Sequence, residues 1–202
     1  MTIIDKTFMI ASAALKHSPI TQSKLKLIPN FISQKEEEQI LNESEKKLKR
    51  LKYQRDHWDD AIVGYREFES ANWSEQTLAV IERVKREAHF SNSPRQLVHV
   101  LDIDAAGFIK PHIDSNRYCG DKVAGVSLLS DSVMRLVNQS DSSKYITLLL
   151  PRLSLYVLAH EFRYDYTHEI LSDEMSFFGD EYVKRDRRVS MVCRSEPSPL
   201  SK

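Results

Sequence analysis

The sequence carries no net charge, few cysteines and no long hydrophobic run. Its 29 basic residues are balanced by 29 acidic residues, which gives no strong overall attraction to nucleic acid. Its two cysteines, Cys119 and Cys193, are too few and too far apart for a disulfide framework or a cysteine metal site. No apolar run is long enough to predict a helix that crosses a membrane.

The 202 residues also show no internal repeat and no second domain, and this length suits one domain with a substantial core. We divide the chain into an N-terminal segment (1–24), one folded domain (25–195) and a tail (196–202). The N-terminal segment contains lysine, serine and threonine, as a mitochondrial transit peptide does, whereas Asp5 and the absence of arginine count against one. These residues alone leave mitochondrial targeting open.

Two helices are predicted in the first half of the chain. Ser33 and Glu36 form a capping box for a helix that is expected to run to about Lys52, and a second helix is expected to begin at Ser74. The residues predicted on the buried sides of these helices are Ile40, Leu41, Leu48, Leu51, Ile81, Val84 and Ala88.

From residue 96 onward the pattern is that of short β-strands separated by turn residues. They are expected at residues 97–103, 107–110, 123–129, 133–137, 145–150, 153–158, 166–171 and 187–194. Many short strands at regular spacing are typical of a β-sandwich or barrel. The expected fold is therefore mainly β, with the two helices packed on one outer face.

A histidine and an aspartate, His112 and Asp114, stand two residues apart in the run 110–115. On a strand or its extended exit, residues i and i+2 point the same way, so both side chains could reach one cation. An imidazole and a carboxylate suit a borderline divalent metal such as Fe(II). Because so short a motif also arises by chance in solvated turns, a metal site needs a third ligand elsewhere in the chain.

Two later histidines, His160 and His168, are the candidates for that ligand. His160 opens the loop after a predicted strand, whereas His168 shares a strand face with Tyr166 and Ile170. A buried histidine needs a hydrogen-bond partner or a metal, and taken alone His168 would more often be a hydrogen-bonded core residue. With His112 and Asp114 before it, His168 completes the two-histidine, one-carboxylate set of non-haem Fe(II) oxygenases.

The last predicted strand alternates so that Arg188, Ser190, Val192 and Arg194 share one face. The commonest co-substrate of such oxygenases is 2-oxoglutarate, a dicarboxylate, and guanidinium groups bind carboxylates in bidentate forks. The alternative is that both arginines face solvent beside their basic neighbours. Val192 on the same face favours an inward orientation.

Together these motifs resemble the AlkB-like Fe(II)- and 2-oxoglutarate-dependent dioxygenases. The resemblance covers about residues 29–194, and the strings 108–115 and 125–130 look most like a mitochondrial branch that is linked to programmed necrosis. The residues that carry it are His112, Asp114, Arg163, Tyr164, Tyr166, His168, Arg188 and Arg194.

This resemblance implies an enzyme with a double-stranded β-helix, or jelly roll. It implies His112, Asp114 and His168 as ligands of Fe(II), Arg188 on the distal carboxylate of 2-oxoglutarate, and Arg194 near the carboxylate beside the keto group. Lining of the co-substrate is assigned to Val189 and Ser190. Many family members carry an Asn-x-Tyr on the strand before the metal motif, where this chain has Leu101-Asp102-Ile103, so the hydroxyl contact is assigned to Tyr156.

The substrate is less clearly indicated than the co-substrates, O2 and 2-oxoglutarate. Because the chain is neutral and its segment before residue 96 has no dense basic stripe, we expect a protein or other non-duplex substrate and no tight binding of duplex DNA. The alternatives are demethylation of alkylated RNA or DNA bases, a signalling module that retains the metal with little turnover, and a zinc-binding cupin-like protein. We expect a monomer in the mitochondrial matrix, with a cytoplasmic location as the alternative.

Overall fold

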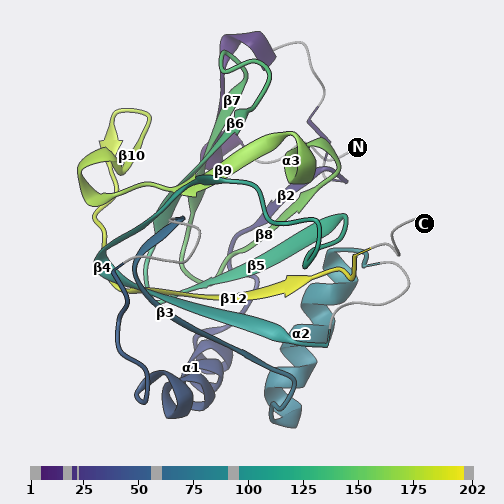
Figure 1. Ribbon diagram of the computed structural model, residues 1–202, viewed down its shortest axis with the longest axis vertical. Helices are drawn as coiled ribbons and strands as arrows, with labels where there is room; N and C mark the ends of the chain where they lie inside the picture. The colour runs from purple at the N-terminus through teal and green to yellow at the C-terminus, as the bar shows by residue number, and fades with distance from the viewer. Residues whose placement is uncertain (1–5, 16–19, 22, 56–60, 91–95, 198–202) are drawn as a thin grey trace.

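The computed structural model describes residues 6–15, 20–21, 23–55, 61–90 and 96–197 as a curled antiparallel sheet with its two long helices on one side (Figure 1). The α-helices are α1 (Gln34–Leu48), α2 (Glu75–Glu87) and α3 (Glu161–Tyr164). The strands are β1 (Met9–Ala11), β2 (Leu25–Ile28), β3 (Ile62–Ser70), β4 (Val98–His112), β5 (Lys122–Leu128), β6 (Ser132–Asn138), β7 (Tyr145–Leu150), β8 (Leu155–Ala159), β9 (Tyr166–Ile170), β10 (Phe177–Phe178), β11 (Glu181–Tyr182) and β12 (Arg188–Arg194).

The ten-stranded sheet folds over on itself because strand β4 takes part in both of its halves. The strand order is β1-β7-β6-β9-β4-β12-β5-β8-β2, and β3 also pairs with β4. Residues near the start of β4 pair with β3 and β12, whereas Ile109 and His112 near its end pair with β9. This is the jelly roll expected from the sequence, with β4 as one continuous strand where two were predicted.

A bulge in β4 lies opposite Gly64 of β3, because residues 104–107 of β4 stand between the pairs Val63–Phe108 and Tyr65–Ile103. The register of β3 against β4 shifts between Val63 and Tyr65, and Gly64 between them has a φ of +65°. A Cβ at Gly107 would collide with the carbonyl oxygens of Val63 and Gly64. The two glycines therefore allow the close backbone approach at which β4 changes direction.

Helices α1 and α2 pack together against the outer face of the half of the sheet that contains β12, β5 and β8 (Figure 1). The predicted caps are present, since Ser33 and Glu36 form the capping box of α1 and Ser74 caps α2. Helix α1 ends at Leu48 rather than near Lys52, so the prediction that Leu51 is buried is wrong, and that side chain is 38% exposed.

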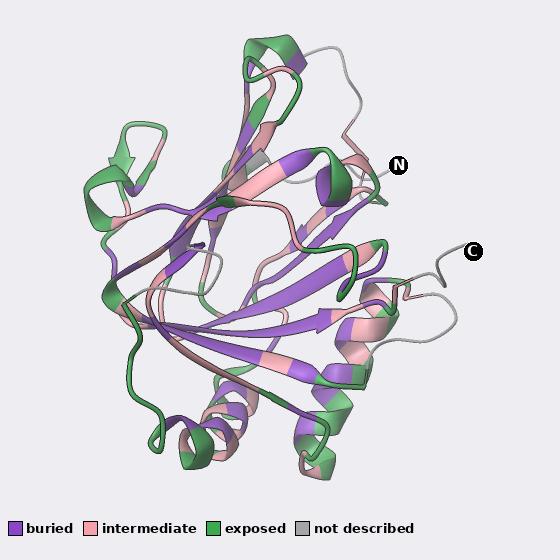
Figure 2. Ribbon diagram, viewed as in Figure 1, coloured by how far each residue is buried: buried purple, intermediate pink, exposed green. Residues whose placement is uncertain are grey.

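Among the described residues there are two large hydrophobic cores and a small third cluster of Cys119, Val123 and Val192. Figure 2 shows the buried strands between the exposed outer faces of the helices and loops. One core lies under the helices and includes Ile40, Val84, Val189 and Met191. The other fills the inside of the roll. Within the described residues, no helix is long and apolar enough to cross a membrane.

Part of the N-terminal segment belongs to the folded domain. Strand β1 pairs with β7, and Leu15 is 6% exposed within the inner core. The sequence predicts the start of the domain at residue 25, and in the structure the chain already joins the sheet at Met9. Residues 1–5, 16–19, 22 and 198–202 of the two terminal segments lie outside the described part of the chain.

Candidate metal centre and co-substrate cleft

A cleft of about 690 Å³ opens between the two halves of the sheet. Strands β3, β4, β8, β9 and β12 all contribute side chains to it. The lining includes Glu67, Phe68, Glu69, His99, Leu101, Ile109, His112, Asp114, Tyr118, Cys119, Met134, Tyr156, His168, Ile170, Arg188, Ser190, Val192 and Arg194.

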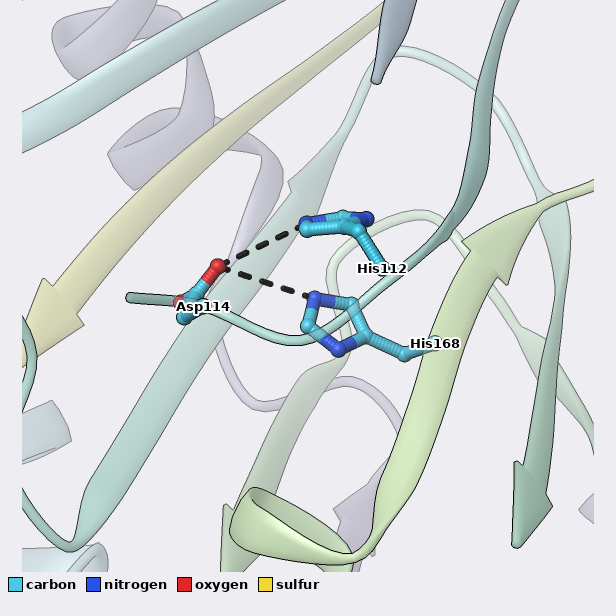
Figure 3. Close-up of side chains that lie close together, drawn as sticks. All are labelled: His112, Asp114 and His168. Atoms are coloured by element: carbon cyan, nitrogen blue, oxygen red, sulfur yellow. Dashed lines mark ion pairs between the residues drawn. The ribbon is translucent and has the colours of Figure 1, made fainter. Parts of the chain in front are cut away.

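The two candidate histidine ligands come from directly opposed positions on neighbouring strands. His112 is the last residue of β4 and pairs in register with His168 of β9, so their ring centroids are 4.2 Å apart. The chain leaves β4 in an extended loop and returns Asp114 to the same point (Figure 3). Asp114 Oδ1 lies 3.5 Å from His112 Nε2 and 3.9 Å from His168 Nε2.

The orientation of the three side chains brings their donor atoms together. His112 Nδ1 lies 3.0 Å from the carbonyl oxygen of Lys110, which places a ring proton on Nδ1 and directs Nε2 at Asp114. Burial lowers the pKa of His168 to about 3, so this imidazole is neutral. Burial opposes ionisation of Asp114, but the adjacent His112 ring and the Arg194 guanidinium outweigh it and hold the pKa of Asp114 well below its usual range.

The three donor atoms form a convergent group: all lie within 4.8 Å of one another, and the separations from Asp114 exceed those of good hydrogen bonds. Two imidazoles and one carboxylate on one side of a cleft match the donor set of a non-haem Fe(II) centre. The other predicted candidate, His160, lies exposed at the start of α3 and does not line the cleft.

At the inner end of the cleft lies a buried guanidinium. Arg188 is 1% exposed, its Nη2 donates to Ser127 Oγ at 3.1 Å, and its Nε has no hydrogen-bond partner among the described residues. Burial lowers the pKa of Arg188, while the Tyr156 hydroxyl beside it acts in the opposite direction. A buried cation with an unpartnered donor is suited to bind a carboxylate.

Tyr156 is held against this guanidinium by the strand next to it. It pairs in register with Gly125 of β5, and a Cβ on Gly125 would overlap the Tyr156 ring. Burial raises the pKa of the Tyr156 phenol, so its hydroxyl keeps its proton and can donate a hydrogen bond. The absence of a side chain at Gly125 therefore determines where this hydroxyl lies.

The predicted alternation along β12 is confirmed, since Arg188, Ser190, Val192 and Arg194 all line the cleft. One predicted lining residue differs: Val189 is fully buried in the core under the helices, because successive side chains of a strand point to opposite faces. The side chain of Val189 therefore points away from the cleft and does not line it.

Three further residues at the site were not singled out from the sequence: Glu67 and His99 line the cleft, and Ser127 contacts Arg188 from behind it. His99 and Leu101 share a face of β4, so the alternation of that strand could have indicated His99. The contact of Ser127 with Arg188 depends on the pairing of β5 with β12, which the sequence pattern does not specify.

No family model matches the chain. It is 49% identical over 174 residues to the mitochondrial alpha-ketoglutarate-dependent dioxygenase alkB homolog 7 of Bos taurus, which covers 85% of this chain and 78% of the relative. The protein of the same name from Mus musculus is 48% identical over an alignment of the same extent. Alpha-ketoglutarate is another name for 2-oxoglutarate.

Solved structures resemble the fold at much lower identity. The structure of OsALKBH1 has a TM-score of 0.62 at 14% identity and covers 88% of this chain and 99% of that one. A Pseudomonas putida prolyl-4-hydroxylase has a TM-score of 0.58 at 11% identity, with coverage of 86% and 92%. The level of sequence identity to the alkB homologues is sufficient to assign the family: this chain belongs to the AlkB-like Fe(II)- and 2-oxoglutarate-dependent dioxygenases.

Proposed function

We propose that His112, Asp114 and His168 hold Fe(II) and that Arg188 and Arg194 bind the two carboxylates of 2-oxoglutarate. The observation that carries this proposal is the convergence of two imidazoles and one carboxylate in the same cleft as a buried guanidinium whose Nε has no partner among the described residues. When they are bound, Fe(II) and 2-oxoglutarate supply the oxidation of a substrate C–H bond by O2, with release of succinate and CO2.

The residues of this chain bind and orient the co-substrate, and they exclude water from the cleft. Arg188 binds the distal carboxylate at the inner end of the cleft, and the Tyr156 hydroxyl donates to the same co-substrate. Ser190 lies between them and Arg194 on the cleft face of β12. Apolar side chains around the triad keep water from the reacting atoms; they are Leu101, Ile109, Met134, Ile170 and Val192.

Anaerobic titration tests this assignment directly. Addition of 2-oxoglutarate to the protein with one equivalent of Fe(II) should produce a visible metal-to-ligand charge-transfer absorption, and Zn(II) should compete for the same site. A protein that binds Zn(II) but shows no such absorption with Fe(II) would be a zinc-binding cupin-like protein. A protein that shows the absorption but forms no succinate in air, with or without substrate, would be a signalling module that retains the metal.

For the substrate, we propose a protein or other non-duplex molecule, with oxidative demethylation of RNA or DNA bases as the alternative. Glu67 and Glu69 of β3 line the cleft together with exposed Tyr118, and carboxylates at this position repel a phosphate backbone. Asp56, Asp59 and Asp60, which support the same prediction from the sequence, lie outside the described residues.

A salt-dependent binding titration with duplex and single-stranded oligonucleotides distinguishes these substrates. We expect no submicromolar binding of duplex DNA near physiological salt. Tight duplex binding with a steep salt dependence would instead support base repair. Binding of single strands alone would support RNA demethylation.

We further propose that the protein acts as a monomer in the mitochondrial matrix and has a role in programmed necrosis. The location is supported by the names of the Bos taurus and Mus musculus relatives, both of which are mitochondrial. The test is import of the full chain into isolated mitochondria, followed by protease treatment and N-terminal sequencing of the protected product. Because β1 joins the sheet, we expect the mature protein to retain Met9.

A further inference from the structure

A chain of four polar side chains crosses three strands of the cleft and ends at the candidate metal ligand Asp114. Arg194 of β12 places its Nε 3.3 Å from Asp114 Oδ2 and its Nη1 3.0 Å from His99 Nδ1 on β4. His99 Nε2 in turn lies 2.7 Å from Glu67 Oε2 on β3. All four residues line the cleft.

The donor and acceptor roles along this chain are fixed by chemistry. A guanidinium can only donate, so His99 must accept at Nδ1 and carry its proton on Nε2. That Nε2 proton is then donated to the Glu67 carboxylate, which is a strong acceptor. Glu67 therefore selects the one neutral tautomer of His99 that can hold Arg194.

His99 also determines how Arg194 meets Asp114. An arginine next to a carboxylate usually forms two parallel hydrogen bonds, one to each oxygen. Here Arg194 reaches only Oδ2, through Nε, while Oδ1 faces the two histidine Nε2 atoms. The nitrogen that could complete a fork with Nε is Nη2, since Nη1 lies on the Cδ side of the guanidinium. The bond from Nη1 to His99 fixes the rotation of the guanidinium, and in this orientation Nη2 does not reach Oδ1, which remains available to a cation. Among the described residues, Nη2 of Arg194 has no hydrogen-bond acceptor, so it can bind an anion.

We propose that His99, oriented by Glu67, is a positioning residue that holds Arg194 on one oxygen of Asp114 and directs it to the carboxylate of 2-oxoglutarate beside the keto group. This proposal rests on the proposed function of the cleft. Without the imidazole acceptor, Arg194 would close onto both Asp114 oxygens, so the affinity for the keto acid and for the metal would fall together.

The test compares His99→Leu, which removes the acceptor, with His99→Asn, whose side-chain oxygen can still accept from Arg194. The dissociation constant of 2-oxoglutarate is measured anaerobically with Fe(II) from the charge-transfer absorption, and that of the metal is measured without co-substrate. His99→Leu should weaken 2-oxoglutarate binding by roughly 10-fold or more, the effect of one hydrogen bond to a charged group. His99→Asn should recover much of this loss, and the exposed control His160→Leu should lose nothing.

Two further measurements locate the effect. Glu67→Leu should weaken 2-oxoglutarate binding in the native background and add little in the His99→Leu background, because it acts through His99. For 2-oxobutyrate, a keto acid without the distal carboxylate, His99→Leu should cause the same fold-loss as for 2-oxoglutarate, whereas Arg188→Lys should weaken only 2-oxoglutarate.

The outcomes separate this inference from the proposed function. If the unmodified protein shows no charge-transfer absorption, the proposed function itself fails. If the unmodified protein binds 2-oxoglutarate and both His99 variants bind it with the same affinity as the unmodified protein, the positioning role is overturned while the proposed function stands. Additive losses from Glu67→Leu and His99→Leu would also overturn it. If His99→Leu does not fold, the same decision is taken from His99→Asn and Glu67→Leu, since unchanged affinity in both contradicts the proposal.

Discussion

The two faces of strand β12 show how one stretch of sequence serves two different purposes. On the face under the helices, Val189 and Met191 are fully buried in a hydrophobic core. On the opposite face, Arg188 and Arg194 carry positive charge into the cleft. The strand thus contributes to folding with one set of side chains and to ligand binding with the other.

The buried polar groups on the two sides of the sheet differ in how completely they are hydrogen-bonded. Under the helices, the buried Glu37 carboxylate accepts from Arg152 and from the Leu129 backbone N–H. Elsewhere, four of the six buried polar side-chain atoms without a partner in the described residues belong to Arg163, Arg185 and Arg188. Burial and the nearby charge of Arg188 lower the pKa of Arg185 to about 10. Of these three arginines, only Arg188 lines the cleft. The helix side therefore supplies stability, whereas the cleft side carries the positive charge of Arg188, which an anionic ligand can neutralise.

The largest expected effect is loss of turnover when a cleft ligand is removed. His168→Ala should reduce iron-dependent succinate formation by a factor of at least about 10³, because two ligands hold the metal poorly and the open positions are no longer defined. The matched control is His160→Ala, which changes the exposed histidine at the start of α3. Succinate release and Fe(II) binding are measured for both, and equal losses would contradict the assignment of the third ligand.

The next effect is on stability and comes from the helix side. Met191→Ala should lower the free energy of unfolding by about 2–4 kcal/mol, because it leaves a cavity in a fully buried core. The dissociation constant of 2-oxoglutarate should stay unchanged, since the side chain points away from the cleft. Denaturant unfolding and anaerobic titration test the two parts separately. A large change in 2-oxoglutarate affinity would show that the two faces are not independent.

Much of this division could be predicted from sequence because it depends on alternation and on local caps. The period of two along residues 187–194 places Arg188 and Arg194 on one face and Val189 and Met191 on the other. Ser33 and Ser74 identified the helix starts because a cap is a contact between neighbours in sequence. The assignment of Val189 to the cleft came from the family resemblance, and the alternation itself contradicts it.

What could not be predicted depends on contacts between distant strands. The sequence predicts separate strands at residues 97–103 and 107–110, whereas pairing with β3 on both sides of the bulge gives one continuous β4. The short strand β1 exists only because β7 offers it an edge. Likewise, His99 meets Arg194 only when β4 and β12 pair in the observed register.

A smaller effect is expected when the guanidinium of Arg188 is replaced by an ammonium group, which keeps the positive charge. Arg188→Lys should weaken 2-oxoglutarate binding by about 1–3 kcal/mol, because the ammonium keeps the charge but loses the planar fork. The charge-transfer titration gives the dissociation constant, and thermal unfolding is measured on the same variant. We expect little loss of stability, since Arg188 Nε has no partner to lose. An unchanged affinity would remove Arg188 from the binding site.

The smallest effect concerns a polar group on the helix side. Glu43 of α1 accepts hydrogen bonds from the Ser74 backbone N–H and hydroxyl and from the Thr77 hydroxyl, at the start of α2. Burial opposes its ionisation, but these bonds lower the pKa of Glu43 from its ordinary 4.5 to about 2. Because the folded-state pKa lies below the unfolded one, Glu43 stabilises the fold fully above pH 4.5 and loses this contribution as the pH falls toward 2.

Glu43→Gln should therefore lower the free energy of unfolding by about 1 kcal/mol at pH 7, and the difference from the unmodified protein should shrink at pH 3. Urea unfolding at the two pH values measures this. The exposed Glu174→Gln, in the loop before β10, is the matched control and should be neutral at both. A difference for Glu43→Gln that stays constant or grows on acidification would mean that the carboxylate is not held by the cap of α2. The helix side would then also contain an unsatisfied charge, and the contrast between the two faces of the sheet would be weaker than we infer.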